Sequence, residues 1–316
     1  MLSNRLKVLI VVISVFTIVI GLIYNPFAGE KPKVVVVLKG SSEQYWQIVK
    51  AGAEKGFLDF GIEGKVIAPR DETEVDLQIN LLKAVLNDQP DLLIVSPISA
   101  EIIPILDEFN ENDIPVLLLD TDYPWENKIA YIGTNNFELG KMGGTFLATQ
   151  LHPSNEVALI AGDLNHPISG ERIKGAKAGL EAAGIKIATE KINLPNEAEP
   201  VKEVMETILQ DHPYIKGVYA ITDIMALGAF EAIEEASLNM PVIGADGVIE
   251  MIKLIENGIL PGTVAQNPYD MGYLSVETAI KVLQGEVVES TIDSGVDIII
   301  KGNALQRLSF QKELMK

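Results

Sequence analysis

Ten residues of this chain carry charged, amide, hydroxyl or aromatic groups at positions that directly follow short apolar runs or open the segments after them. Hydrogen bonds to charged groups contribute roughly 1.5–3 kcal/mol each, more than bonds between neutral groups. Flat aromatic rings pack against the C–H faces of a sugar ring. This combination predicts a binding site for a small hydroxylated ligand, formed by Lys39, Tyr45, Trp46, Asp120, Asp122, Asn136, Arg172, Thr222, Asp246 and Gln266.

Structural roles are open for the same residues. An aromatic pair such as Tyr45-Trp46 also packs into a core when it opens a helix. Arg172 could pair with a nearby acid, and Asp246 could serve as a turn or helix-cap residue because it precedes Gly247. The residue types alone are compatible with ligand binding and with a structural role.

Motifs for catalysis are missing from the sequence. The three histidines form no metal-binding or triad-like spacing, and no G-x-S-x-G nucleophile motif is present. Asp120 and Asp122 could form the carboxylate pair of a glycosidase, but the same pair suits hydrogen bonding to sugar hydroxyls without bond cleavage. We therefore expect binding rather than catalysis, with no catalytic residue, no cofactor and no metal.

Cysteine is absent from the 316 residues, which removes disulfides, thiolate metal sites, cysteine nucleophiles and a lipid-modified cysteine. The formal net charge is −19, with 25 basic and 44 acidic residues. Such a negative surface repels phosphate backbones, so we expect no nucleic-acid partner. It favours a neutral or cationic ligand.

From residue 33 onward, short apolar runs of strand length alternate with segments of helical periodicity. This alternation is typical of parallel sheets covered by helices on both faces. The pattern runs through once and then restarts, which predicts two α/β units. The expected strands are 34–38, 66–68, 92–95, 116–119 and 130–132, then 157–161, 185–188, 218–221, 242–245 and 263–265. The expected helices are 43–60, 75–86, 101–110, 170–183, 201–210, 225–236 and 248–256.

Two such units side by side create a cleft between them. In open α/β sheets, ligands bind beyond the carboxyl ends of the strands, where the loops converge. The ten candidate residues come from these loops or from the segments that the loops introduce, so we expect the cleft to collect them.

The first thirty residues differ from the rest of the chain. Arg5 and Lys7 precede an uncharged run over 8–29, whose apolar part is 8–23. Sixteen helical residues span roughly 24 Å, slightly less than a bilayer core of about 30 Å, and extending the helix to residue 27 closes the gap. We expect residues 1–29 to form a single transmembrane anchor with the remainder outside the cell. The alternative is a signal peptide that is cleaved to leave a secreted or periplasmic protein.

An ordered series of motifs over 33–300 resembles the periplasmic sugar-binding proteins of the ribose-binding type. The order and spacing of the motifs carry the resemblance more than any one of them. The series is Tyr45-Trp46, Ala51-Gly52-Ala53, Ile114-Pro115-Val116 leading to Asp120, Ile132-Gly133-Thr134-Asn135-Asn136 with Gly140, Arg172 with Gly175, Thr222-Asp223-Ile224-Met225-Ala226-Leu227-Gly228, Gly244-Ala245-Asp246-Gly247 and Ala265-Gln266-Asn267.

The resemblance implies two doubly wound parallel-sheet lobes that are joined by three hinge strands and close on a small ligand. Lobe I would comprise 33–134 with 267–293, and lobe II would comprise 135–266 with 294–316. The resemblance places aromatic stacking on Tyr45 and Trp46, and ligand hydrogen bonds on Asp120, Asp246, Gln266 and Arg172.

The chain departs from the ribose binders at four positions. It has Glu43 and Thr222 where they have Asn, and Thr121 where they have Arg. Lys39 adds a charge that they lack. These differences argue against ribose itself as the ligand.

The resemblance allows two functions for one binding mechanism. The first is the binding component of an ABC-type sugar importer, which delivers a monosaccharide to a membrane permease. The second is a membrane-anchored sugar sensor that signals through a partner such as a histidine kinase. The missing cysteine removes the usual lipid anchor of an importer subunit and so raises the sensor alternative, while the importer stays the first interpretation.

Overall fold

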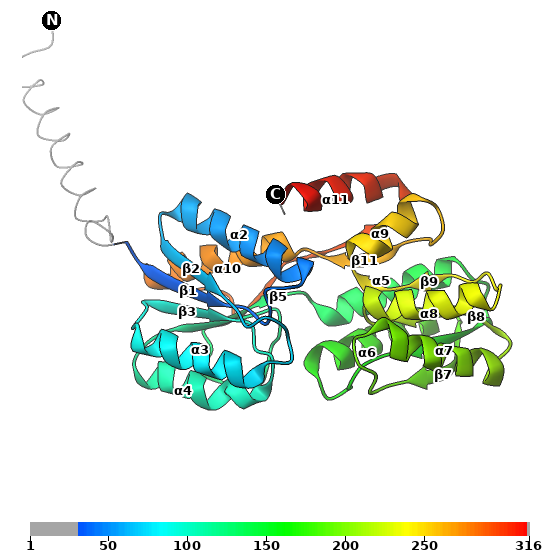
Figure 1. Cartoon of the computed structure of the whole chain (residues 1–316), viewed down its shortest axis with the longest axis horizontal. Coiled ribbons are helices and arrows are strands. Elements are labelled where there is room, and N and C mark those ends of the chain that lie inside the picture. Colours follow the sequence, from blue (N-terminus) through cyan, green and yellow to red (C-terminus); the bar gives the residue numbers. More distant parts are fainter. Residues whose placement is uncertain (1–30, 315–316) are drawn as a thin grey trace, which may run out of the picture.

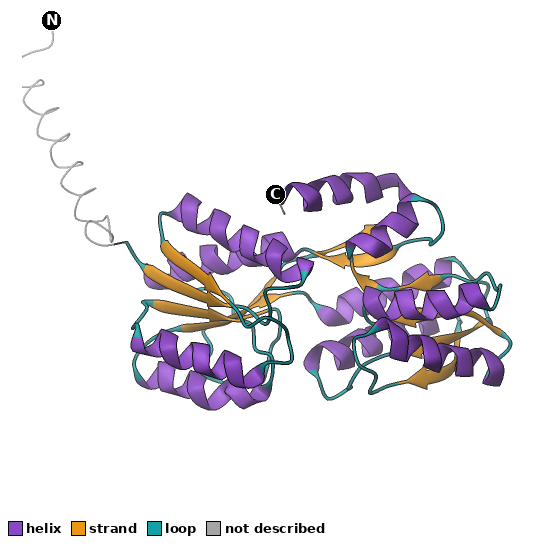
Figure 2. Cartoon of the chain, in the orientation of Figure 1, coloured by secondary structure: helices purple, strands orange, loops and turns teal. Residues whose placement is uncertain are grey.

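The computed structural model describes residues 31–314 and has an α/β fold with parallel sheets (Figures 1 and 2). Ten α-helices and thirteen strands lie within this range. The predicted membrane anchor or signal segment at residues 1–29 falls outside it. Across residues 31–314, none of the helices has the length and apolar character needed to cross a membrane.

A six-stranded parallel sheet forms the centre of the first lobe. Continuous apolar runs make its central strands, and all four residues of β3 and of β4 are buried, as expected for parallel strands that are covered on both faces. The sheet order is β12-β5-β4-β3-β1-β2. The strands are β1 (Lys33–Val37), β2 (Glu63–Ile67), β3 (Leu92–Val95), β4 (Val116–Leu119), β5 (Ala130–Gly133) and β12 (Thr291–Asp293).

Helices cover both faces of this sheet. The helices α2 (Gln44–Phe60) and α10 (Pro268–Leu283) pack together on one face, and α3 (Val75–Asn87), the short 3₁₀ helix η1 (Ala100–Ile102) and α4 (Ile103–Glu111) lie on the other (Figure 1). Glycines bring α2 and α10 close, because an added Cβ on Gly52 would collide with the carbonyl group of Tyr269, and one on Gly272 with the carbonyl group of Val49. The sequence analysis did not predict α10.

A four-stranded parallel sheet, ordered β7-β6-β8-β9, forms the main part of the second lobe. Its strands are β6 (Glu156–Ile160), β7 (Lys186–Lys191), β8 (Ile215–Ala220) and β9 (Val242–Ile243). The helices α5 (Asn136–Thr149) and α6 (Pro167–Ala182) pack against each other, as do α7 (Ala198–Asp211) and α8 (Asp223–Glu235).

The rest of the second lobe adds a small mixed sheet to the two predicted parallel sheets. The predicted strand 242–245 is divided at Gly244 into β9 and β10 (Ala245–Asp246). β10 joins a separate three-stranded sheet with β11 (Thr263–Gln266) and β13 (Val296–Ile299), in which β11 and β13 are antiparallel. A Cβ on Gly244 would collide with the carboxylate of Asp223, so the buried acid requires glycine at the break. The helices α9 (Ile249–Glu256) and α11 (Lys301–Leu314) pack together beside this sheet.

Three short connections link the two lobes. They are residues 134–135 between β5 and α5, residue 267 between β11 and α10, and residues 294–295 between β12 and β13. The predicted lobe boundaries fall in these connections, and their action as hinges stays a prediction. With this topology, the carboxyl ends of β1, β4, β6, β8 and β10 face the space between the lobes.

Candidate functional site

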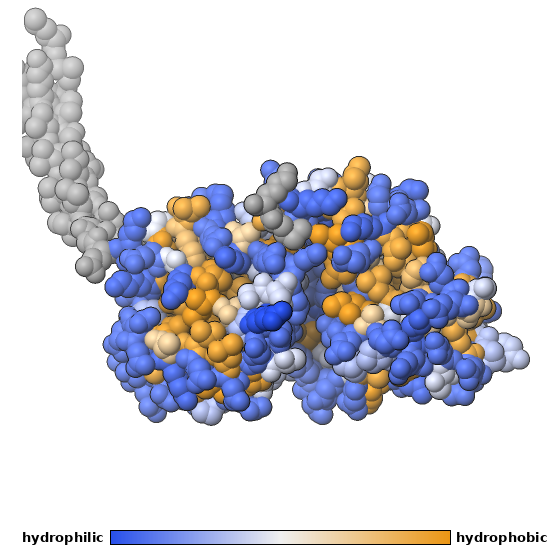
Figure 3. Space-filling model, in the orientation of Figure 1, coloured by the Kyte–Doolittle hydropathy of each residue, from blue (hydrophilic) through white to orange (hydrophobic). Residues whose placement is uncertain are grey.

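A cavity of about 130 Å³ lies between the lobes, and the molecular surface is hollowed there (Figure 3). Charged and amide side chains from both lobes line it together with aromatic and aliphatic groups. Its residues are Lys39, Glu43, Tyr45, Trp46, Glu72, Asp120, Ile168, Arg172, Asn196, Thr222, Ile224, Asp246, Val248 and Gln266.

A buried ion pair forms the wall of the cavity in lobe I. Lys39 follows β1, Asp120 follows β4, and their Nζ and Oδ2 atoms are 2.8 Å apart. Lys39 also donates to the hydroxyl oxygen of Thr121 over 2.6 Å. Burial disfavours the charge on Lys39, but Asp120 outweighs it and raises the pKa of Lys39 above its ordinary value. Burial likewise opposes the charge of Asp120, but Lys39 holds the pKa of that carboxyl group below its ordinary value. Both groups are therefore charged at neutral pH.

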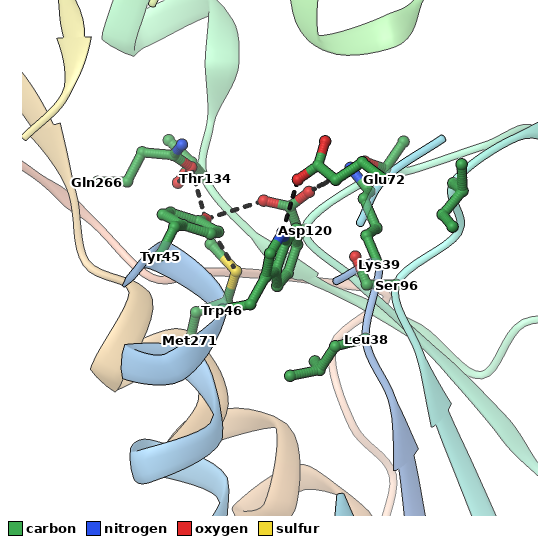
Figure 4. A network of polar contacts seen from close by, with 12 residues as sticks. Leu38, Lys39, Tyr45, Trp46, Glu72, Ser96, Asp120, Thr134, Gln266 and Met271 are labelled. Carbon is green, nitrogen blue, oxygen red and sulfur yellow. Dashed lines mark hydrogen bonds and ion pairs between the residues drawn. The ribbon is translucent and has the colours of Figure 1, made fainter. Parts of the chain in front are cut away.

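Tyr45 connects this ion pair to the segment between the lobes. Its hydroxyl group donates to Oδ1 of Asp120 over 2.9 Å and lies 3.3 Å from Oε1 of Gln266 (Figure 4). Tyr45 lies in the first turn of α2, so the helix directs its hydroxyl group toward the ends of β4 and β11.

Trp46 is packed rather than open to a ligand. Its side chain is 2% exposed, and its ring meets the edge of Tyr45 with centroids 4.9 Å apart. Nζ of Lys39 lies 5.5 Å from the ring centroid, and the indole N–H donates to Oε1 of Glu72 over 2.6 Å (Figure 4). This position favours the core-packing reading of Trp46, and ligand stacking by its ring stays a prediction.

A second ion pair forms the wall in lobe II. Arg172 of α6 donates from Nη1 to Oδ1 of Asp246 over 2.8 Å and to the carbonyl oxygen of Ile221 over 2.7 Å. Its Nε donates to Oδ1 of Asn136 over 2.9 Å. Arg172 is 2% exposed, so these acceptors fix the position of its guanidinium group. Asp246 is the last residue of β10, and its positive φ of 112° turns the chain at the end of the strand.

Gln266 lies between the two walls. Its Nε2 donates to Oδ1 of Asp246 over 2.7 Å, and its Oε1 accepts from the hydroxyl group of Thr134 over 2.8 Å. Because Tyr45 also approaches Oε1, polar contacts run without a break from the Lys39–Asp120 pair to the Arg172–Asp246 pair. A ligand in the cavity can therefore contact both lobes and the segment that joins them.

A buried carboxyl group supports the Asp246 loop from behind. Asp223, at the start of α8, accepts hydrogen bonds from the backbone N–H groups of Gly247 and Val248 over 2.7 and 2.8 Å. Burial, with the nearby charge of Asp246, raises the pKa of Asp223 to about 8. Thr222 caps the same helix by accepting from the N–H of Met225, and its hydroxyl group donates to Asn196 over 2.6 Å.

The structure brings eight of the ten predicted residues to this cavity. The other two, Asp122 and Asn136, line a neighbouring cavity of about 360 Å³. Asp122 pairs with Lys128, so it does not form a carboxylate pair with Asp120 in the cleft. Asn136 acts on the cleft through its hydrogen bond with Arg172.

Sequence reasoning did not place Glu43, Glu72 and Asn196 among the site residues. Glu72 and Asn196 lie in the loops after β2 and β7, so the rule that ligands bind at strand ends applies to them as well. In the sequence, Glu43 stands out only as a departure from the ribose binders. Burial, with the charge of Glu72, raises the pKa of Glu43 to about 7.

The charges in the cavity lining are unequal. Lys39 and Arg172 are its cations, whereas Glu43, Glu72, Asp120 and Asp246 are its acids. Each cation already has a carboxylate partner at 2.8 Å. The cleft therefore disfavours anionic ligands and suits neutral or cationic ones. Within residues 31–314, no group of three or more histidine, aspartate or glutamate side chains is arranged to hold a metal ion.

Comparisons with known proteins agree with this geometry. A family profile described as a periplasmic binding protein domain matches residues 34–287. The ribose import binding protein RbsB of Haemophilus influenzae is 26% identical over 285 residues, which cover 89% of this chain and 96% of that protein.

Two solved structures share the fold. The ABC transporter periplasmic solute binding protein of Actinobacillus succinogenes, with bound D-allose, is 26% identical at a TM-score of 0.78, and covers 87% of this chain and 100% of its own. GanP, a glucose-galactose binding protein of Geobacillus stearothermophilus, is 28% identical at a TM-score of 0.79, with coverages of 87% and 99%. These similarities confirm the resemblance that the sequence motifs predicted.

Proposed function

The chain belongs to the periplasmic binding protein family, and from this premise we propose that it binds a small sugar outside the cytoplasm and closes its lobes around it. The observation that carries the proposal is the cavity between the lobes, where Gln266 lies between two buried ion pairs. The named relatives bind ribose, D-allose, or glucose and galactose, which supports a monosaccharide as the ligand class.

The polar groups of the cavity match the hydroxyl groups of a sugar. Asp120 and Asp246 are acceptors for sugar O–H groups, while Lys39, Arg172 and the amide of Gln266 are donors. Oδ1 of Asp246 accepts from both Arg172 and Gln266, but no donor among residues 31–314 reaches Oδ2. We propose that Oδ2 accepts a sugar hydroxyl group. Because Lys39 and Tyr45 hold the carboxyl group of Asp120, and Arg172 and Gln266 hold that of Asp246, the ligand meets an ordered site.

Binding can drive closure because the two walls belong to different lobes. A ligand shifts a conformational equilibrium only through contacts that differ between the two states. A sugar that contacts both Asp120 and Asp246 makes its full set of hydrogen bonds only when the lobes are together, so it selects the closed arrangement. We propose that the three connections at 134–135, 267 and 294–295 act as the hinges.

Delivery to an ABC-type permease is the function that we propose for the closed form. The relatives are named as a ribose import binding protein and an ABC transporter solute binding protein, which supports a binding, non-enzymatic role here. A membrane-anchored sensor is the second candidate. It is favoured by the apolar run at 8–23 and by the lack of a cysteine for lipid attachment.

A thermal-shift screen of the full chain tests the proposed function. The panel contains D-ribose, D-allose, D-glucose, D-galactose, D-glucosamine and D-ribose 5-phosphate. A ligand at a hundred times its Kd stabilises the native state by about 2.7 kcal/mol, which raises the Tm measurably. We expect at least one neutral or amino sugar to raise the Tm and the phosphate to have no effect. A panel in which no sugar raises the Tm would contradict the proposal.

A further inference from the structure

The helix α11 connects the two lobes on their outer side. It extends from the side of α9 in lobe II toward α2 in lobe I (Figure 1). Ala304 and Leu308 on its inner face are 0% and 6% exposed and belong to the hydrophobic core of lobe II. The first half of α11 is thus fixed to lobe II. The helix lies beyond residues 34–287, where the family profile matches.

The second half of α11 contacts lobe I. The ring of Phe310 packs against Tyr269, in the first turn of α10, with centroids 5.7 Å apart and planes at 77°. Ile48 of α2 lines a small cavity together with Phe310 and Gln311. One helix therefore carries a core contact with lobe II at its start and an aromatic contact with lobe I near its end.

Two further residues of α11 touch the segments that hold the ligand site. Arg307 donates to Oδ1 of Asn267 over 3.0 Å and to the carbonyl oxygen of Gln266. Nε2 of Gln311 donates to the carbonyl oxygen of Gly247 over 2.9 Å. Gly247 directly follows Asp246, and Gln266 contacts both walls of the cleft. A shift of α11 would thus act on the backbone of two segments that line the cavity.

The contact between α11 and lobe I is loosely packed. A void of about 60 Å³ lies among Tyr269, Phe310 and Gln311. Nε of Arg307 and Oε1 of Gln311 are buried, and among residues 31–314 they have no hydrogen-bond partner. Unsatisfied buried polar groups and missing packing contacts both weaken an interface. This contact can therefore form and separate at low cost, as expected of an element that moves.

We propose that α11 is an interlobe strap that favours the arrangement in which the lobes meet across the cleft. Ala304 and Leu308 anchor it in lobe II, and opening of the cleft is proposed to separate Tyr269 of lobe I from Phe310. The strap would thereby regulate opening of the cleft. The effect of the strap on ligand binding rests on the function proposed above, whereas the existence of the strap does not.

Pulsed electron paramagnetic resonance on the full chain tests the strap without any ligand. The chain has no native cysteine, so spin labels attach only to the Leu58→Cys and Tyr214→Cys positions. These residues are 79% and 77% exposed and lie in different lobes. The labels are compared in the wild-type background, in Phe310→Ala and in Leu305→Ala. Leu305 is the matched control because it is 62% exposed on the same helix.

We expect Phe310→Ala to increase the population at longer interlobe distances at least twofold, with Leu305→Ala matching the wild-type distribution. Gln311→Ala, which removes the bond to Gly247, should change the distribution in the same direction. A Phe310→Ala distribution that coincides with wild type, or that moves to shorter distances, would overturn the proposal. Either result leaves the proposed function intact, since the measurement needs no sugar.

Discussion

The Nζ atom of Lys39 and the Oδ2 atom of Asp120 lie 2.8 Å apart, and these side chains are 7% and 5% exposed. Each group stabilises the charge of the other in a buried wall. The pair therefore makes the cleft polar and at the same time makes the fold sensitive to loss of either partner.

Lys39→Met should destabilise the protein strongly at neutral pH. Methionine replaces the aliphatic part of the side chain, but it leaves the carboxylate of Asp120 buried without a cation. Removal of one partner of a buried pair costs about 3–5 kcal/mol. Urea denaturation of the full chain at pH 7 measures this loss. The double variant Lys39→Met/Asp120→Asn should recover part of it, and a double variant as unstable as the sum of both single variants would contradict the coupling.

Trp46→Ala should lower the free energy of unfolding, because the side chain packs in the core rather than against the ligand. The indole ring is 2% exposed and belongs to the lobe I core, and truncating a buried tryptophan costs about 3–5 kcal/mol. Trp46→Phe keeps a ring without the donor to Glu72 and should lose less. The denaturation midpoint of each variant in urea checks this. An unchanged midpoint with weaker sugar binding would instead support stacking on the ligand.

Glu43→Gln should stabilise the protein at alkaline pH but not at acid pH. The pKa of Glu43 is raised from 4.5 to about 7, so the folded protein holds this proton more tightly than the unfolded chain. As the pH rises from 4.5 to 7, the unfolded chain loses the proton first, and Glu43 lowers the stability of the fold. Above pH 7 this loss stays constant.

The charged groups that act on Glu43 come from three places. Glu72 and Asp71 follow β2, Lys39 follows β1, and Asp246 lies across the cleft. Tm values of wild type and Glu43→Gln between pH 4 and pH 8 test the prediction, with the exposed Glu63→Gln as the control. The Tm difference for Glu43→Gln should grow between pH 4.5 and 7, and a difference that is constant across the range would show that the carboxyl group does not titrate there.

The sequence predicted those parts of the fold that depend on large apolar residues. The β-branched and leucine-rich runs at β1, β3, β4, β6 and β8 were predicted as strands, and the structure confirms the α/β fold. The helices α5 and α10 were not predicted, because small residues occupy part of their packed faces. In α5, Gly140 and Gly144 lie against the backbone of α6, where a Cβ would collide with the carbonyl groups of Arg172 and Ala176.

The site residues, too, could be predicted from the sequence only in part. Position after a strand end brought Lys39, Asp120, Asp246 and Gln266 together, but it could not separate Asp120 from Asp122. The backbone of Asp120 is left-handed, with a φ of 64°, and Asp122 lies beyond this turn, paired with Lys128. A local backbone conformation of this kind cannot be predicted from the residue types.

Titration calorimetry of wild type and Asp246→Asn tests the central claim most directly. Asparagine keeps the shape of the side chain and an oxygen for Arg172 and Gln266, but it removes the charge and replaces Oδ2, the proposed acceptor for a sugar O–H group, with an NH2 donor. The full chain is titrated with D-ribose, D-allose, D-glucose, D-galactose and D-glucosamine. We predict that wild type binds at least one of them with one site per chain, and that Asp246→Asn, with an unfolding transition similar to wild type, binds it at least tenfold more weakly. Equal affinity in the two proteins, or no binding of any sugar to wild type, would contradict the assignment of this cleft as a sugar site.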